Sequence, residues 1–359
     1  MVKTVLLVGW LALLGSFPQQ SLPNTDDPAK KPQVSKEHER LAQEQGLFRW
    51  KGKLDYTFGR VDPLTGEKGP KYISLQGEST SQMILGEQFL LTRTLTQGKK
   101  TPEYQIRGYR SDLKQYFVIV MEELRTPFSY RSGKEEKGER ILKDPSGYVT
   151  EVTRFDADDQ SSESEIFLGE AKTPFLTLSS EPKKGRTTDL WASLMAAKPI
   201  PRVVNTSDER DDPAENYSPE HQLFHKFAGD MTTESEEVLP RAGRIICDGR
   251  FLALLNVSDI KNKSVSSLTL IGFDSTRGAF QMFVLHDKSP NPEYYEGDFD
   301  GVTLTFRNPF AGEGKADQPV LIYNFVARGP GFTETDLRTE AGKKAEPVLF
   351  KPSRNFRRK

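Results

Sequence analysis

The sequence predicts an all-β protein built from two tandem copies of one antiparallel domain, either a barrel or a sandwich. Short apolar segments recur at roughly ten-residue spacing, with almost no helix between them. The same motifs occur twice in one order, at separations of roughly 160 to 185 residues along a chain of 359 residues. The 23 prolines and 28 glycines supply the many turns that such a chain needs.

Three motifs carry the duplication. Each copy begins with Glu-His and a short helical pattern that ends at a glycine. An apolar segment that contains a glycine follows, and later a Gly-aromatic turn leads straight into an apolar strand. The corresponding segments are 37–46 and 220–229, 84–90 and 246–252, and 108–116 and 272–280. We therefore predict a duplicated domain in which a short helix precedes each set of strands.

Composition indicates the domain boundaries. Segments rich in proline, aspartate and lysine, without apolar periodicity, flank the two strand-rich regions and are expected to be linkers. The expected parts are a signal peptide at 1–21, a disordered linker at 22–36, a first domain at 37–183, a linker at 184–218, a second domain at 219–352 and a basic tail at 353–359. Within the second linker, residues 190–195 could form a short helix packed on a neighbour. We expect the two domains to fold when expressed separately, and proteases to cut first between Lys184 and Asn216.

The first residues indicate export. Lys3 precedes an apolar run at residues 5–15, which is about half the roughly twenty residues that a spanning helix needs. We predict a signal peptide cleaved near Ser16 or Ser21, and an uncleaved amino-terminal anchor is the alternative. After cleavage we expect no integral membrane span and a periplasmic or extracellular location.

Composition and motifs argue against several classes of function. The formal net charge of -1 creates no global field that would recruit nucleic acid. The single cysteine, Cys247, excludes a disulfide framework and is expected to be a small buried hydrophobic residue. The sequence has no nucleophile elbow, phosphate-binding glycine loop or zinc-protease motif. His221 and His225 lie four residues apart but lack a third ligand, so we expect neither a metal nor a cofactor.

The motifs resemble those of the bacterial domain-of-unknown-function family fifteen-seventy-nine. That family begins with Glu-His, has Gly-x-Trp at its first strand and an Ile-Leu-Gly-Gly-Arg-Phe-Leu segment, and then has a Gly-Tyr-Asp turn. Here the start is matched twice, whereas the tryptophan is displaced to Trp50 in the first copy and replaced by Met231 in the second. The first copy keeps Gly86 without the arginine, and the second copy keeps Arg250. The resemblance implies two lipocalin-like β-barrels, each preceded by a short capping helix, in a family without an assigned ligand.

An apolar stripe with a period of two identifies a candidate wall in each copy. Its members are Tyr116, Val118 and Val120 in the first copy and Phe280, Met282 and Val284 in the second. Core packing and ligand contact both account for such a stripe, because an eight-stranded barrel either holds one small ligand or is filled by its own side chains. His286 continues the stripe, and Glu122 takes its place in the first copy.

The sequence favours an exported, non-catalytic binding module for a small apolar or amphiphilic ligand, with the second copy as the binding copy. The predicted ligand-binding residues are Arg250, Phe280, Met282, Val284 and His286. An arginine and a histidine near one end of an apolar barrel would suit a ligand with an acidic head. Self-filled barrels that act through their surfaces, in envelope structure or protein interaction, are the alternative, and a hydrolase is a more distant one.

Overall fold

The structure, a computed structural model, describes most of both duplicated regions. The described residues are 35–55, 66, 71–99, 101–121, 128–156, 161–196, 219–233, 239–247, 249–259, 264–310, 318–325, 331–337 and 347–352. The predicted signal peptide, residues 22–34 of the first linker, residues 197–218 of the second linker, the basic tail and Glu122 lie outside these residues.

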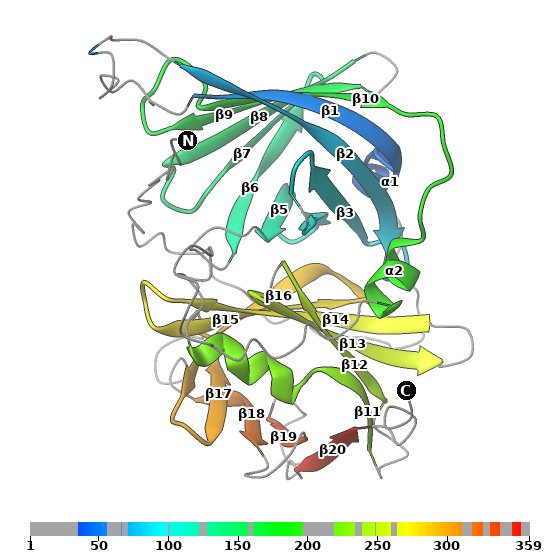
Figure 1. Ribbon diagram of the computed structural model, residues 1–359, viewed down its shortest axis with the longest axis vertical. Helices are drawn as coiled ribbons and strands as arrows, with labels where there is room; N and C mark the ends of the chain where they lie inside the picture. Colours follow the sequence, from blue (N-terminus) through cyan, green and yellow to red (C-terminus); the bar gives the residue numbers. More distant parts are fainter. Residues whose placement is uncertain are drawn as a thin grey trace.

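Two closed antiparallel barrels are stacked along the long axis of the molecule (Figure 1). Each barrel has ten strands, and each strand is hydrogen-bonded to the next one along the chain. The predicted fold class is therefore confirmed, and the barrels have two strands more than the eight considered from the sequence. Because the diameter of a barrel grows with strand number, each barrel has a wider interior to fill.

The first barrel follows helix α1 (Lys36–Ala42). Its strands are β1 (Gly46–Asp55), β2 (Tyr72–Ile84), β3 (Phe89–Thr96), β4 (Glu103–Arg110), β5 (Gln115–Met121), β6 (Ser129–Glu136), β7 (Glu139–Lys143), β8 (Val149–Phe155), β9 (Ser162–Leu168) and β10 (Leu176–Pro182). β1 pairs with both β2 and β10, which closes the sheet.

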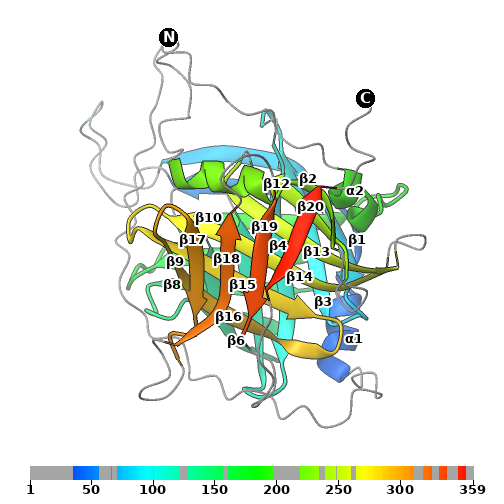
Figure 2. The same ribbon diagram turned by 90° about the horizontal axis from the view of Figure 1, so that it is seen from below.

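The second barrel follows the 3₁₀ helix η2 (Pro219–Lys226). Its strands are β11 (Gly229–Thr233), β12 (Arg241–Ile246), β13 (Phe251–Asp259), β14 (Ser264–Asp274), β15 (Ala279–His286), β16 (Ser289–Phe299), β17 (Thr303–Arg307), β18 (Pro319–Phe325), β19 (Phe332–Asp336) and β20 (Val348–Pro352). β11 pairs with β12 and β20 and closes this barrel. Figure 2 shows the molecule from below, with β18, β19 and β20 side by side on the wall of the second barrel that faces the viewer.

The duplicated Glu-His start forms the plug at one end of each barrel. His38 of α1 is buried edge-on against Tyr109, with ring centroids 6.1 Å apart. His221 of η2 is buried edge-on against Phe273, at 5.8 Å. Tyr109 and Phe273 are the aromatic residues of the Gly-aromatic turns, so two of the repeated motifs meet at each plug. The motifs therefore have a structural role, and burial lowers the pKa of His38 from its ordinary value.

The two barrels share one apolar core through their outer walls. Side chains on β3 to β6 of the first barrel belong to the same buried cluster as side chains on β12 to β16 of the second. Tyr130 stacks on Phe283 at a centroid distance of 6.1 Å, and Phe128 lies 5.0 Å from Phe251. Helix α2 (Leu190–Ala196) contributes Leu190 to the same cluster, which confirms the predicted short helix. Each sheet closes on itself, so the barrels share packing but no strand.

The contact between the barrels is reciprocal. A Cβ on Gly86, in the turn between β2 and β3, would lie 3.3 Å from the carbonyl oxygen of Asp287, just beyond β15. Cys247 occupies the corresponding turn of the second barrel, and its Sγ lies 3.4 Å from the carbonyl oxygen of Met121 at the end of β5. Leu85 and Cys247 also share a left-handed backbone, with φ of 51° and 50°. The same surface of each copy therefore meets the other, as in the two-fold interface of a homodimer.

Candidate functional site

The inner face of the first barrel is identified by its contact with the plug. Leu41 of α1 packs against Tyr116, Val118 and Val120, so alternate residues of β5 point inward. Strand register carries this assignment around the barrel, because directly paired residues lie on the same face. The intervening residues of β5, such as Ile119, point outward into the core shared with the second barrel.

Inward apolar side chains near the end opposite the plug include Val149 and Leu168, which are buried, and six that are half-buried. The half-buried ones are Leu54, Ile73, Leu75, Ile166, Leu176 and Leu178, on β1, β2, β9 and β10. Solvent therefore reaches apolar surface on the inside of this barrel. We call these six side chains the apolar mouth.

A belt of hydroxyl and amide side chains lines the barrel below the apolar mouth. Ser81 and Thr92 form a hydroxyl pair at 2.9 Å, and Thr153 and Ser164 form another at 2.9 Å. Gln105 faces inward at the same depth and is half-buried. These short side chains occupy little volume compared with the aromatic residues that fill a packed barrel.

Two buried N–H donors in this belt lack an acceptor among the described residues. They are Nε1 of Trp50 and Nε of Arg131, whose side chains belong to residues with 9% and 7% exposure. The Trp50 ring lies over Gly77, where a Cβ would come within 2.7 Å of it, so the glycine makes room for the indole. Buried donors are normally paired, and each of these therefore needs an explanation.

A chain of alternating charges runs from Arg131 in the belt to Arg40 of α1 in the plug. The ion pairs are Arg131–Glu151 at 3.0 Å, Arg107–Glu151 at 3.8 Å, Arg107–Glu44 at 3.1 Å, Arg140–Glu44 at 2.8 Å, Arg140–Glu135 at 2.5 Å and Arg40–Glu135 at 3.0 Å. Burial alone would raise the pKa of Glu44, but Arg140 and Arg107 outweigh it and lower that pKa. Among the described residues, Arg131 has one carboxylate partner, Glu151, and shares it with Arg107.

The interior of the second barrel is filled by its own side chains. Its buried cluster contains Phe224 from η2, Phe227 directly after η2, and seven further aromatic residues from the barrel wall. Phe280, Met282 and Val284 point into this cluster with exposures of 1%, 0% and 2%. Core packing, one of the two alternatives for the apolar stripe, accounts for all three residues.

Arg250 and His286 are not brought together. Arg250 lies in the turn between β12 and β13, at the end that η2 plugs, and is half-buried. His286 lies at the far end of β15, where it pairs with Ser267 of β14. The predicted pair of polar anchors for one ligand head is thus split between the two ends of the barrel.

A polar network closes the end of the second barrel near His286. Arg241 binds Glu334 and donates to Asn256 at 2.8 Å, and Asn256 donates to Ser267 at 2.7 Å. All four side chains point inward by register. Because these groups satisfy one another, the network stabilises the barrel end without calling for a ligand.

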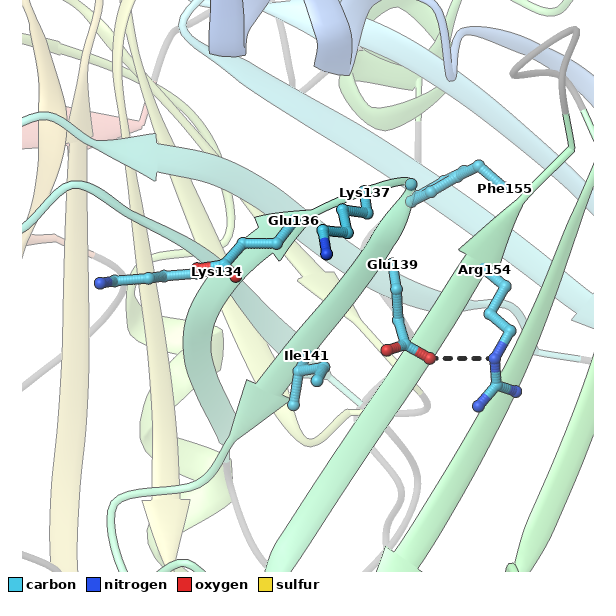
Figure 3. A pocket seen from close by; sticks show the side chains of 8 residues that line it. Lys134, Glu136, Lys137, Glu139, Ile141, Arg154 and Phe155 are labelled. Atoms are coloured by element: carbon cyan, nitrogen blue, oxygen red, sulfur yellow. Dashed lines mark ion pairs between the residues drawn. The ribbon is translucent and has the colours of Figure 1, made fainter.

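A surface groove of about 640 Å³ lies outside the first barrel, along the hairpin of β6 and β7 (Figure 3). Figure 3 shows Glu139 paired with Arg154, whose Nε lies 2.9 Å from the carboxylate. Ile141, also in the groove, is 40% exposed. The groove is open, and Glu139 and Arg154 neutralise each other within it, so it provides few of the convergent groups of a binding site.

The sequence analysis did not predict Arg131 or the polar belt. The two copies nevertheless differ in polarity at corresponding positions, and that difference indicates the belt. Arg131 corresponds in strand register to Tyr295 of the second copy, and Arg107 corresponds to Ile271. Each polar residue points inward in the first barrel where an apolar or aromatic residue fills the second. Comparison of the two copies at inward positions would have identified the first barrel as the one with the more polar interior.

Comparisons with known proteins leave the function open. No family model matches the sequence, and no curated protein matches it either. Among solved structures, the chain has a match to a protein of unknown function from the DUF3598 family of Nostoc punctiforme, at 10% identity and a TM-score of 0.19. That match covers 88% of this chain and 98% of the other. Within the described residues, no helix has the length and apolar character needed to cross a membrane.

Proposed function

We propose that this protein is a non-catalytic binding module and that its first barrel holds one small amphiphilic ligand. The observation that supports this function is the half-buried apolar mouth, because inward apolar surface left in contact with water favours an apolar ligand. The polar belt beneath it supplies hydrogen-bonding groups for the polar part of the ligand. The second barrel, with its aromatic core, acts as a structural partner that covers the outer wall of the first.

The experiment fills the mouth with a larger side chain. Leu178 points inward on β10, and Leu178→Trp should occupy the space of the ligand tail. Ser179 is the next residue on the same strand and is exposed on the outer face, so Ser179→Trp is the matched control. Binding is measured with a fluorescent fatty-acid analogue on the purified two-barrel protein, and circular dichroism checks that each variant is folded.

We expect Leu178→Trp to abolish the fluorescence gain and Ser179→Trp to leave it unchanged. Equal binding by the two variants would place the ligand elsewhere, and a wild-type protein that binds no analogue would refute the proposed function.

We also propose that residues 1–21 direct export of the protein, on the pattern of a basic residue followed by a short apolar run. Mass spectrometry of the protein recovered outside the cytoplasm should show a chain that begins after Ser16 or Ser21. A full-length chain retained in the cytoplasm would contradict export.

A further inference from the structure

We infer that the first barrel selects ligands with a carboxylate head, which lies between Arg131 and Trp50 while the apolar tail points toward the mouth. This inference rests on the proposed function, because it names the chemical class of the ligand for the same interior.

The two donors without acceptors face each other across the barrel. Trp50 lies on β1 and Arg131 on β6, and these strands are five places apart in a ring of ten. Both residues point inward by register. The paired residues can be traced from strand to strand between β1 and β6. When the tilt of the strands is allowed for, Trp50 and Arg131 lie at about the same height along the barrel axis. An acceptor between these two walls can therefore receive a hydrogen bond from each side.

The charge of Arg131 favours an anion over a neutral acceptor. Its Nη2 is engaged by Glu151 at 3.0 Å, but that carboxylate also lies 3.8 Å from Arg107. The guanidinium is thus incompletely neutralised, and its Nε remains without an acceptor among the described residues. A carboxylate supplies two acceptor oxygens for the two donors. It also supplies one negative charge for Arg131, which shares Glu151 with Arg107. A phosphate monoester would bring more negative charge than this arrangement neutralises, with Glu151 close by.

The surroundings fix the orientation of the ligand. From Arg131 the charged chain continues to Arg40 of α1, so the plug lies on one side of the two donors. The apolar mouth lies on the other side, and its leucine and isoleucine side chains are half-buried. A monocarboxylate with an aliphatic tail would satisfy both donors with its head and cover the mouth with its tail.

The test uses four twelve-carbon probes that share one tail. They are dodecanoate, dodecanol, methyl dodecanoate and dodecyl phosphate, each measured by competition with a fluorescent analogue against the two-barrel protein. We expect dodecanoate to bind about ten- to a hundredfold more tightly than dodecanol, because a charge-assisted hydrogen bond replaces a neutral one. This comparison needs no variant, so it stands even if a substitution impairs folding.

Two variants then remove the donors. Arg131→Met should weaken dodecanoate about ten- to a hundredfold and leave dodecanol within about twofold. Trp50→Phe keeps an aromatic ring over Gly77 while removing the N–H, and it should weaken dodecanoate by about fivefold. Arg154→Met, on the exposed outer face of the same barrel, is the control for loss of an arginine and should change nothing.

The outcomes separate the two proposals. Equal affinity for all four probes, or equal losses for dodecanoate and dodecanol in Arg131→Met, would overturn the carboxylate head and leave the binding function intact. Tighter binding of dodecyl phosphate than of dodecanoate would also overturn it. Failure of every probe to bind would refute the proposed function itself.

Discussion

Truncation of Phe283 should uncouple the two barrels. Phe283 is 2% exposed on the outer face of β15. Its ring lies 5.2 Å from Phe128 and 6.1 Å from Tyr130, both on the first barrel, and 5.0 Å from Tyr294 on its own. The substitution Phe283→Ala would therefore leave an unfilled space at the centre of the shared core.

The expected loss is large relative to the stability of the protein. A buried Phe→Ala substitution costs about 3–5 kcal/mol, from the lost transfer free energy and from the cavity that remains. A natural domain is stable by only about 5–15 kcal/mol. The loss falls on contacts between the barrels, so it should weaken their cooperation more than the fold of either one.

Urea denaturation and calorimetry of the whole chain measure this effect. We expect the wild-type protein to unfold in one transition and Phe283→Ala to unfold in two, one for each barrel. Phe280→Ala is the matched control, because Phe280 lies on the same strand, is equally buried and points into the second barrel. The control should destabilise the second barrel by a similar amount without separating the transitions. Two separate transitions in the wild type, or a loss below about 1 kcal/mol for Phe283→Ala, would refute the shared core.

Three further predictions follow from the packing and the charges. Residues 35–196 and 219–352, expressed separately, should each self-associate in gel filtration because each would expose its apolar outer wall to water. When the two fragments are mixed, they should form a one-to-one complex. Two stable monomers would contradict this prediction and support the independent domains expected from the sequence. The pKa of Glu44 is lowered below its ordinary value of 4.5, so its contribution to stability is present above about pH 4.5 and is lost as the pH falls through the lower folded value. Glu44→Gln should therefore destabilise the protein at neutral pH and flatten the acid limb of its stability curve, and an unchanged limb would show that Glu44 does not contribute. Cys247 is buried at the contact with Met121, and its burial was predicted from its sequence neighbours. Its thiol should react with a thiol reagent slowly in the native protein and rapidly in urea. Rapid labelling of the native protein would mean that the barrels separate in solution.

The duplication, the all-β class and the plugs could be predicted from the sequence because they depend on local patterns. The spacing of apolar segments and turns reports strands, and the paired Glu-His and Gly-aromatic motifs report two copies of one unit. His38 and His221 then occupy equivalent places in the structure, each against the aromatic residue of its own copy. Such features need no knowledge of which face of a strand is inside.

The site depended on that knowledge, and only the tertiary structure supplied it. In β5 the residues Tyr116 and Val118 alternate with Phe117 and Ile119, so both faces are apolar and a period of two cannot tell the inside from the outside. In β4 the apolar face with Ile106 points outward, because the second barrel covers it, while Arg107 points inward. The usual assumption that the apolar face is the interior therefore fails where a second domain buries the outer wall. That contact between barrels, which no local pattern encodes, allows the first barrel to line its interior with polar groups.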